Sequence, residues 1–224
     1  MKHEQLDLIA PPPELTRAEA LSRLELIIGQ DLRPLADQFG ITVWKDGRLN
    51  KGWAGQVVEA YLGRSPNSEK AADFGEWELK VVSLSPTVDG ALRPKESMAI
   101  AMFTAGELEE QSFEESHLLE KLGKLIVVAR LYAGPEESTS IMLGSALFDL
   151  DHPAIYEQVV EDYEEARWVV RNEGVHALGG GIGRLVQTRV KGGAGAGRGG
   201  HCFYAQSQFV GYILGLFDDP FGSH

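Results

Sequence analysis

Two carboxylates and a lysine stand close together in one short segment, AADFGEWELK, residues 71–80. Asp73, Glu78 and Lys80 form the pattern D-x4-E-x-K. Two carboxylates can hold a hard divalent cation through oxygen, and an ammonium group beside an attacking water stabilises developing negative charge. The pattern therefore indicates metal-assisted cleavage of a phosphodiester. It is also compatible with a surface strand that carries an ordinary ion pair.

The residues around Glu78 are predicted to form a β-strand, because EWELKVV alternates and becomes β-branched at its end. Successive side chains of a strand point to opposite faces, so Glu78 and Lys80 share one face and Trp77 and Leu79 share the other. We expect the face of Glu78 to be wet and the face of Trp77 to lie in the core.

Glu59 is a third candidate carboxylate. The segment KGWAGQVVEAYL, residues 51–62, is predicted to be a helix that Asn50 caps and Gly63 ends, with Glu59 opposite its apolar face. Gly55 lies beside Glu59, and a glycine inside a helix costs about 1 kcal/mol relative to alanine. Such a cost suggests that another backbone or a ligand comes close here, although a solvated Glu59 remains the alternative.

Lys121 is a second candidate cation. It lies in ESHLLEKL, just before KLIVVARLY, residues 124–132. That continuous apolar run is typical of a strand buried on both faces. A lysine at this place could contact a phosphate, or it could be an ordinary surface lysine.

The remaining patterns interleave helices and strands, which predicts an α/β or α+β class with a mixed sheet. Thr16 and Glu19 have the spacing of a capping box, and Gly29 is expected to end that helix. Further helices are expected over residues 31–39 and 152–172, and further strands over 97–104, 183–193 and the start of 202–217. The acidic run EQVVEDYEE, residues 157–165, is expected to be a solvated helix face without chemistry.

Charge is distributed unevenly along the 224 residues. The net charge of −12 argues against a protein that coats nucleic acid electrostatically. However, no Asp or Glu occurs from Gly174 to Phe217, and that stretch carries four cations, Arg184, Arg189, Lys191 and Arg198. The absence of acidic residues indicates that the stretch binds an anion, or that it is a glycine-rich loop with a buried strand, which would also lack acidic residues.

Cysteine content and hydropathy limit the class of protein further. Cys202 is the single cysteine, which rules out an internal disulfide and a thiolate-ligated zinc cluster and favours a reducing cytoplasm. We expect a cytoplasmic protein without membrane association, because the sequence shows neither a signal peptide nor an apolar run of membrane-spanning length.

Five blocks in order carry a resemblance to a known family: KGWAGQVVEAYLG, ADFGEWELK, ESHLLEKL, QTRVKGG and CFYAQSQF. The sequence resembles the MutH family, the methyl-directed mismatch-repair endonuclease and related GATC-cutting restriction enzymes, within the PD-(D/E)XK nuclease superfamily. The resemblance implies an α/β restriction-endonuclease-like fold, in which helices flank a mixed β-sheet core and two arms surround a DNA cleft.

The resemblance also implies roles for individual residues. The metal-proximal carboxylates would be Glu59, Asp73 and Glu78, with Lys80 and Lys121 as active-site lysines. The candidate DNA-binding residues are Lys51, Arg184, Arg189, Lys191, Arg198 and Tyr204, of which Arg184 and Arg198 are named for their location in the acid-free stretch. Among these, Arg189 and Lys191 fall on the base-reading segment of the family, and Tyr204 on its aromatic contact. The spacing from Asp73 to Glu78 is shorter than the usual pattern of the family.

The implied function is a sequence-specific, Mg²⁺-dependent DNA endonuclease that nicks the unmethylated strand at GATC-like sites in mismatch repair, with Mn²⁺ as an alternative ion. A restriction enzyme that cuts both strands and a non-catalytic DNA-binding module are the alternatives. The expected partners are double-stranded DNA and a mismatch-repair activating protein, and the free chain is expected to be a monomer. We expect one nuclease domain, with an N-terminal arm (1–70), a catalytic core (71–173) and a C-terminal reading arm (174–224).

One competing motif lies in the acid-free stretch. Gly195, Gly197 and Gly200 fit the dinucleotide fingerprint G-x-G-x-x-G. That fingerprint requires a helix immediately after it, whereas the following CFYAQSQFV is aromatic and β-prone. A nucleotide-dependent oxidoreductase is therefore disfavoured.

Overall fold

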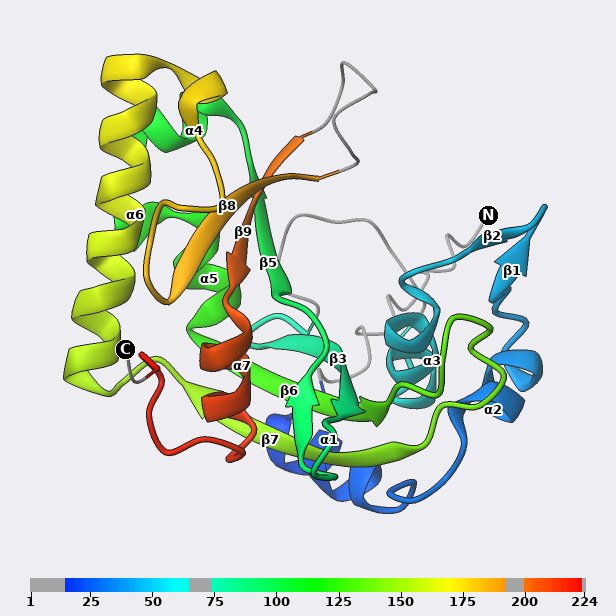
Figure 1. Ribbon diagram of the computed structural model, residues 1–224. Helices are drawn as coiled ribbons and strands as arrows, with labels where there is room; N and C mark the ends of the chain where they lie inside the picture. Colours follow the sequence, from blue (N-terminus) through cyan, green and yellow to red (C-terminus); the bar gives the residue numbers. More distant parts are fainter. Residues whose placement is uncertain (1–14, 65–73, 192–199, 223–224) are drawn as a thin grey trace, which may run out of the picture.

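The computed structural model describes residues 15–64, 74–191 and 200–222 (Figure 1). Asp73 and Arg198, two of the predicted site residues, lie outside these ranges. The described chain forms two main sheets with helices around them, so the predicted α/β class with a mixed sheet and flanking helices is confirmed. Within the described part of the chain, no helix is both long and apolar enough to cross a bilayer.

The central sheet has four strands in the order β4 (Leu92–Pro94), β3 (Glu78–Pro86), β6 (Lys124–Leu131) and β7 (Met142–Asp149). β3 and β6 are parallel, and the other two pairs are antiparallel. β6 is buried on both faces from its second to its seventh residue, as its continuous apolar sequence predicts.

Two hydrophobic cores lie on opposite faces of this sheet. Leu125 and Val127 of β6 belong to one core, and Ile126 and Val128 belong to the other, because side chains alternate along a strand. The second core is closed by three N-terminal helices, α1 (Arg17–Glu25), α2 (Leu32–Gln38) and α3 (Trp53–Tyr61).

Local sequence sets the ends of these N-terminal helices. The predicted capping box of α1 is present: Glu19 N donates to the Thr16 hydroxyl, and the Thr16 amide donates to the Glu19 carboxylate. α1 ends at Glu25, earlier than the predicted Gly29. α3 begins at Trp53 with Gly52 as its N-cap, so the predicted cap by Asn50 is wrong. Instead, the Asn50 side chain accepts from Gly52 N in the turn before the helix.

A two-stranded hairpin, β1 (Trp44–Lys45) and β2 (Arg48–Leu49), precedes α3. Asp46 and Gly47 form its tip with positive φ angles of 51° and 72°. Both central residues of a type I′ turn require such angles, and Asp-Gly is one of the sequences that adopts it most readily. The Trp44 indole donates to the Glu136 carbonyl at 3.1 Å, which ties the hairpin to the body of the protein.

The second sheet is antiparallel and has the order β5 (Met98–Phe103), β9 (Gly200–Ala205) and β8 (Val186–Lys191). The strand expected at the start of 202–217 corresponds to β9, and the rest of that segment begins with the short helix α7 (Ser207–Ile213). The side chains of sheet β5–β9–β8 that face the long helix α6 (Pro153–Glu173) complete the first core. α6 lies along one side of the molecule, and hairpin β1–β2 lies on the opposite side (Figure 1).

Shorter helices connect the two sheets. α4 (Ala105–Glu110), the 3₁₀ turn Phe113–Glu115 and α5 (His117–Leu122) lie between β5 and β6, and a second 3₁₀ turn, Val175–Ala177, follows α6. Thr104 is the N-cap of α4 and Ser116 is the N-cap of α5. The Thr104 hydroxyl accepts from Glu107 N, and the Ser116 hydroxyl accepts from Leu119 N.

The acidic residues of the run 157–165 are exposed on α6 as expected, except for Asp162, for which the expectation is wrong. Asp162 is only 2% exposed, and its carboxylate accepts the backbone amides of Arg184, Leu185 and Val186, each at 2.7 Å. Burial raises the pKa of the Asp162 carboxyl, and these amide hydrogen bonds act in the opposite direction. Asp162 therefore fixes the start of β8 against α6.

Candidate active site

Glu78 is the first residue of β3 and is held between two lysines. Its side chain is 1% exposed. Lys80 Nζ forms an ion pair with Glu78 Oε1, and Lys121 Nζ lies 3.3 Å from Oε1 and 3.5 Å from Oε2. The structure thus brings together three of the predicted site residues, two from β3 and one from α5.

The parallel pairing of β3 and β6 explains why residues 43 positions apart meet. Glu78 lies opposite Leu125 in the register of the two strands, and α5 ends directly before β6. The turn between them is tight, because a Cβ at Gly123 would lie 2.7 Å from the Leu119 carbonyl oxygen. Glycine at this position lets Lys121 lie above the first residues of the sheet.

The prediction that Glu78 lies on a solvent-exposed face of β3 is therefore wrong. Lys121 of α5 contacts Glu78 at this end of the strand. The alternating sequence EWELKVV cannot predict this burial, because α5 lies 43 residues later in the sequence, measured from Glu78 to Lys121. A buried carboxylate is costly unless charged partners compensate for its lost hydration. Lys80 and Lys121 supply two positive charges for one negative charge, so these three side chains together attract an anion such as a phosphate.

Glu59 is half-buried on α3, the helix that packs against β3. A Cβ at Gly55 would lie 3.9 Å from Glu59 Oε1, so the carboxylate extends over the small residue one turn earlier. Asp73 lies outside the described residues. The chain directly after it forms a tight turn, in which the rings of Phe74 and Trp77 stack with centroids 4.1 Å apart.

The described carboxylates suit a hard cation. Glu59 and Glu78 offer oxygen, the donor type that Mg²⁺ and Mn²⁺ prefer, and Glu78 already lies in a strongly charged environment. No group of three or more His, Cys, Asp or Glu side chains able to hold a metal occurs among the residues that the structure describes, a set that omits Asp73.

A second polar cluster lies on the face of sheet β5–β9–β8 that points away from α6. Arg189 Cζ lies 5.5 Å from the centroid of the Tyr204 ring, and Arg189 Nη2 donates to Ser97 Oγ at 3.1 Å. Burial raises the pKa of the Tyr204 hydroxyl above its ordinary value. Two of the predicted DNA-binding residues, Arg189 and Tyr204, are thus in contact.

Two of the other predicted DNA-binding residues, Arg184 and Lys51, form no hydrogen bond or ring contact with that cluster among the described residues. Arg184 lies two residues before β8, with its guanidinium carbon 4.6 Å from the Phe221 ring centroid. Lys51 is exposed in the turn before α3. Lys191 ends β8, where the structure describes its backbone only, and Arg198 lies outside the described residues.

The sequence patterns missed several residues around these sites. Gln187 and Ser97 surround the Arg189 guanidinium, yet neither carries a charge that would attract attention. Lys45 and Arg48 pair across hairpin β1–β2 and are exposed. The Asp-Gly pair between them was the available signal for this hairpin.

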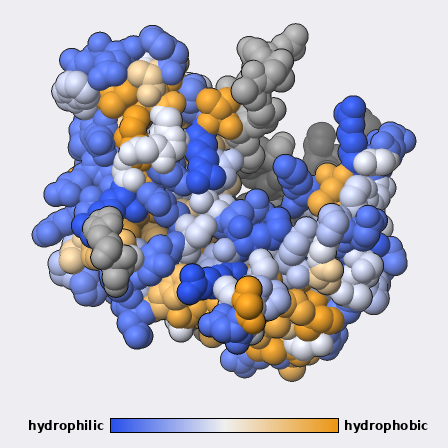
Figure 2. Space-filling view, in the orientation of Figure 1, coloured by the Kyte–Doolittle hydropathy of each residue, from blue (hydrophilic) through white to orange (hydrophobic). Residues whose placement is uncertain are grey.

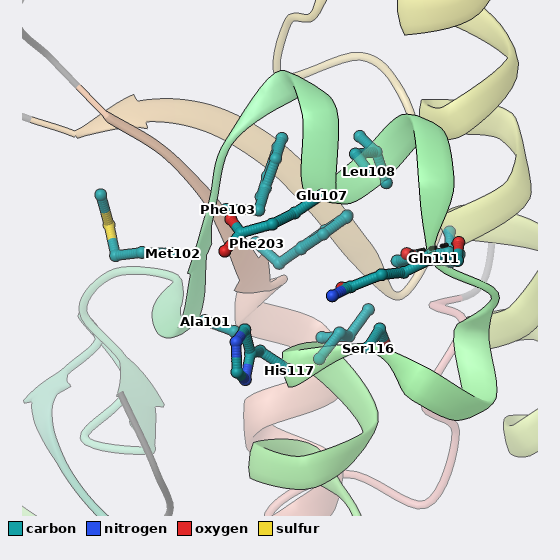
Figure 3. Close-up of a pocket in the computed structure, with 11 residues that line it drawn as sticks. Ala101, Met102, Phe103, Glu107, Leu108, Gln111, Ser116, His117 and Phe203 are labelled. Atoms are coloured by element: carbon teal, nitrogen blue, oxygen red, sulfur yellow. Dashed lines mark hydrogen bonds between the residues drawn. The ribbon is translucent and has the colours of Figure 1, made fainter. Parts of the chain in front are cut away.

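A small pocket lies beside the candidate site, between β5, α4 and α5 (Figure 3). Phe103 and Phe203 form much of its apolar wall, Gln111 points into it, and His117 lies at its edge. His117 is one helical turn before Lys121 on α5. The pocket is mostly apolar and contains neither Glu78 nor Arg189, so we assign it no chemistry.

The molecule is hollowed between its two sides. Figure 2 shows a notch between the side that carries α6 with sheet β5–β9–β8 and the side that carries hairpin β1–β2 and α3. The second sheet lies on one side of this notch, and exposed Lys45, Arg48 and Lys51 belong to the other side.

Comparison with known proteins identifies relatives. Residues 62–154 match the family model described as DNA mismatch repair enzyme MutH. The DNA mismatch repair protein MutH of Vibrio cholerae serotype O1 (strain M66-2) is 28% identical over 181 residues, which cover 80% of each chain. MutH of Shewanella sp. (strain W3-18-1) is 27% identical over 186 residues, which cover 82% of this chain and 80% of that protein.

A solved structure, a complex of the restriction endonuclease MvaI with cognate DNA substrate, aligns over 93% of this chain and 98% of its own, with 12% identity and a TM-score of 0.40. The matched family segment contains Glu78, Lys80 and Lys121. The chain is therefore similar to MutH DNA mismatch repair proteins over about four fifths of its length, and the central part of it matches the family model.

Proposed function

We propose that this protein is a divalent-cation-dependent DNA endonuclease that nicks the unmethylated strand at GATC-like sites in mismatch repair. The observation that carries the proposal is the buried Glu78 carboxylate between Lys80 and Lys121, in a segment that matches the MutH family model. Hydrolysis of a phosphodiester adds negative charge to the phosphate, and two ammonium groups beside a metal-binding carboxylate are arranged to stabilise that charge.

Glu78 and Glu59, with Asp73, would hold Mg²⁺ through carboxylate oxygens. The bound ion would polarise the phosphate and lower the pKa of a coordinated water. Lys80 orients the attacking water from β3, and Lys121 approaches from α5 to neutralise charge on the scissile phosphate. Because Glu78 is buried, its electrostatic interactions with the two lysines are stronger than they would be at a fully exposed site.

The notch supports duplex DNA as the substrate. Arg189 and Tyr204 belong to sheet β5–β9–β8, which lies on one side of the notch, and Lys51 precedes α3 on the opposite side. A positively charged group on each side can contact the phosphates that flank a target step, and an arginine stacked on an aromatic ring is suited to hydrogen-bond a guanine edge. The net charge of −12 of the whole chain limits adhesion to DNA that lacks the site.

The proposal is tested with supercoiled, unmethylated plasmid, incubated with the protein in Mg²⁺ and, separately, in EDTA. Nicked circles that form only with Mg²⁺ and map to particular sites are the expected product. Prompt linearisation into discrete fragments would instead identify an enzyme that cuts both strands. DNA binding without cleavage in either Mg²⁺ or Mn²⁺ would contradict the proposal and identify a binding module.

Replacing Arg189 by alanine is expected to remove site preference more than it slows cutting of non-cognate DNA. A bidentate arginine contact to guanine contributes about 1–3 kcal/mol of discrimination, which corresponds to roughly 5- to 150-fold. The measurement is the ratio of cleavage rates on a cognate duplex and on one with a single changed base pair. An equal loss of rate on both duplexes would contradict a reading role for Arg189.

A further inference from the structure

The Gln187 side chain links Arg189 to a neighbouring turn. Gln187 is 4% exposed on β8, two residues before Arg189 and on the same face of the sheet. With its amide oxygen toward the guanidinium, Gln187 accepts from Arg189 Nε at 3.1 Å and also from Nη2, and its NH₂ group donates to the Gly180 carbonyl at 2.6 Å. The opposite orientation would place amide donors against guanidinium donors, which is electrostatically unfavourable.

The guanidinium is therefore held on three sides. Gln187 occupies the edge formed by Nε and Nη2, Ser97 Oγ accepts from Nη2 at 3.1 Å, and the Tyr204 ring lies under the plane. Among the described residues, no hydrogen bond involves Nη1. The N–H group of Nη2 that donates to Ser97 Oγ lies on the same edge as Nη1, so a ligand with two acceptors can bind this Nη1–Nη2 edge by displacing Ser97 Oγ.

We propose that Gln187 is a positioning residue for DNA recognition, holding the Arg189 guanidinium so that its Nη1–Nη2 end faces a guanine base edge. This inference rests on the proposed function. An arginine side chain that is already fixed loses less rotamer entropy when it binds, so its contact discriminates between bases more strongly. Gln187 touches no DNA itself in this proposal and acts only through Arg189.

Gln187 is the residue type that the arrangement requires. Its amide has an acceptor for Arg189 and a donor for the Gly180 carbonyl, and both are used. Leucine has a similar size but neither group. Glutamate keeps the acceptor for Arg189 but cannot donate to Gly180, so Gln187→Glu separates the two contacts of Gln187.

The test compares single-turnover cleavage of a cognate duplex with cleavage of the same duplex carrying 7-deazaguanine at a guanine of the mapped site. Gln187→Leu is expected to lower the preference for the cognate duplex about tenfold, within the range of one bidentate contact, and to leave the rate on the modified duplex unchanged. Gln187→Glu is expected to retain most of the preference. Gln187→Leu should cause no additional loss when Arg189 is already alanine, because both residues act through one contact.

Thr188→Val is the matched control. Thr188 is 1% exposed, its hydroxyl donates to the Gly179 carbonyl at 3.4 Å in the same turn, and it points to the other face of the sheet. Thr188→Val removes the hydrogen bond to Gly179 but leaves the contacts of Arg189 in place. The preference for the cognate duplex over the modified duplex should therefore remain. The positioning role is wrong if Gln187→Leu keeps the wild-type preference for the cognate duplex. It is also wrong if Gln187→Leu lowers that preference as much in the Arg189→Ala background as in the wild type.

A second measurement separates this inference from the proposed function. The Nε–Hε resonance of Arg189 in the free protein reports the contact with Gln187 by its shift and slow hydrogen exchange. Protection in the wild type that disappears in Gln187→Leu supports the contact, even if the wild type cuts no DNA and the proposed function fails. An unprotected Nε–Hε in the wild type overturns the inference whatever the cleavage results are.

Discussion

Glu78→Gln is expected to lower the rate of Mg²⁺-dependent nicking by at least about a hundredfold, the effect typical of removing one essential electrostatic group from an active site. Glutamine keeps the size and one oxygen of the side chain but loses the negative charge that would bind the cation. The same change leaves Lys80 and Lys121 without their shared carboxylate. DNA affinity should therefore be unchanged or higher, since two ammonium groups become available to a phosphate.

The measurement combines single-turnover nicking with a binding titration on the same duplex. Glu157→Gln is the matched control, because Glu157 is exposed on α6 and the substitution changes the net charge equally. Leaving two partly buried ammonium groups without this carboxylate should also cost roughly 1–3 kcal/mol of unfolding free energy. Wild-type nicking by a folded Glu78→Gln protein would contradict the assignment, and lost nicking together with lost DNA binding would indicate a structural rather than a catalytic defect.

Asp162→Ala is expected to be the most destabilising single change away from the active site. The substitution leaves three backbone amides, those of Arg184, Leu185 and Val186, without the acceptor that they share. An unsatisfied buried donor costs about 1–3 kcal/mol, so a total loss near 3 kcal/mol is a conservative expectation. In a protein of this size, that loss lowers the melting temperature by roughly 6–12 °C.

Thermal unfolding followed by circular dichroism checks this expectation. Glu165→Ala is the control, because Glu165 lies one helical turn later and accepts the Gly183 amide at 3.1 Å from an exposed position. Its cost should stay below about 1 kcal/mol, since water can replace an exposed acceptor. Equal melting temperatures for the wild type and Asp162→Ala would show that water or another group satisfies these amides.

The sequence predicted the elements whose patterns are local. The apolar run at 124–132 and the capping box at Thr16 each correspond to the element that the structure contains. In both cases, the residues that determine the element lie within it, so short-range periodicity and capping chemistry are sufficient. The pattern D-x4-E-x-K likewise indicated where to look for charged groups, because its members are close in sequence.

Features that depend on distant segments were not predictable. The burial of Glu78 depends on α5, and the burial of Asp162 depends on amides that follow it by more than 20 residues. The acidic run at 157–165 resembled a solvated face because one buried carboxylate cannot be distinguished by type from its exposed neighbours. The contact between Gln187 and Arg189 could not be predicted for a related reason. An uncharged amide indicates a positioning role only when its two partners, here Arg189 and the Gly180 carbonyl, are known.

The docking of α1 has a consequence for how the chain folds. Arg17 forms an ion pair with Asp149, 132 residues later, and Arg17 Nη2 donates to the Leu125 carbonyl at 3.1 Å. The first helix therefore cannot dock until β6 and β7 have been synthesised and paired, and contacts of such long sequence separation slow folding. During translation, the N-terminal helices must wait with their apolar faces uncovered. We expect refolding to be slow and prone to aggregation at high protein concentration.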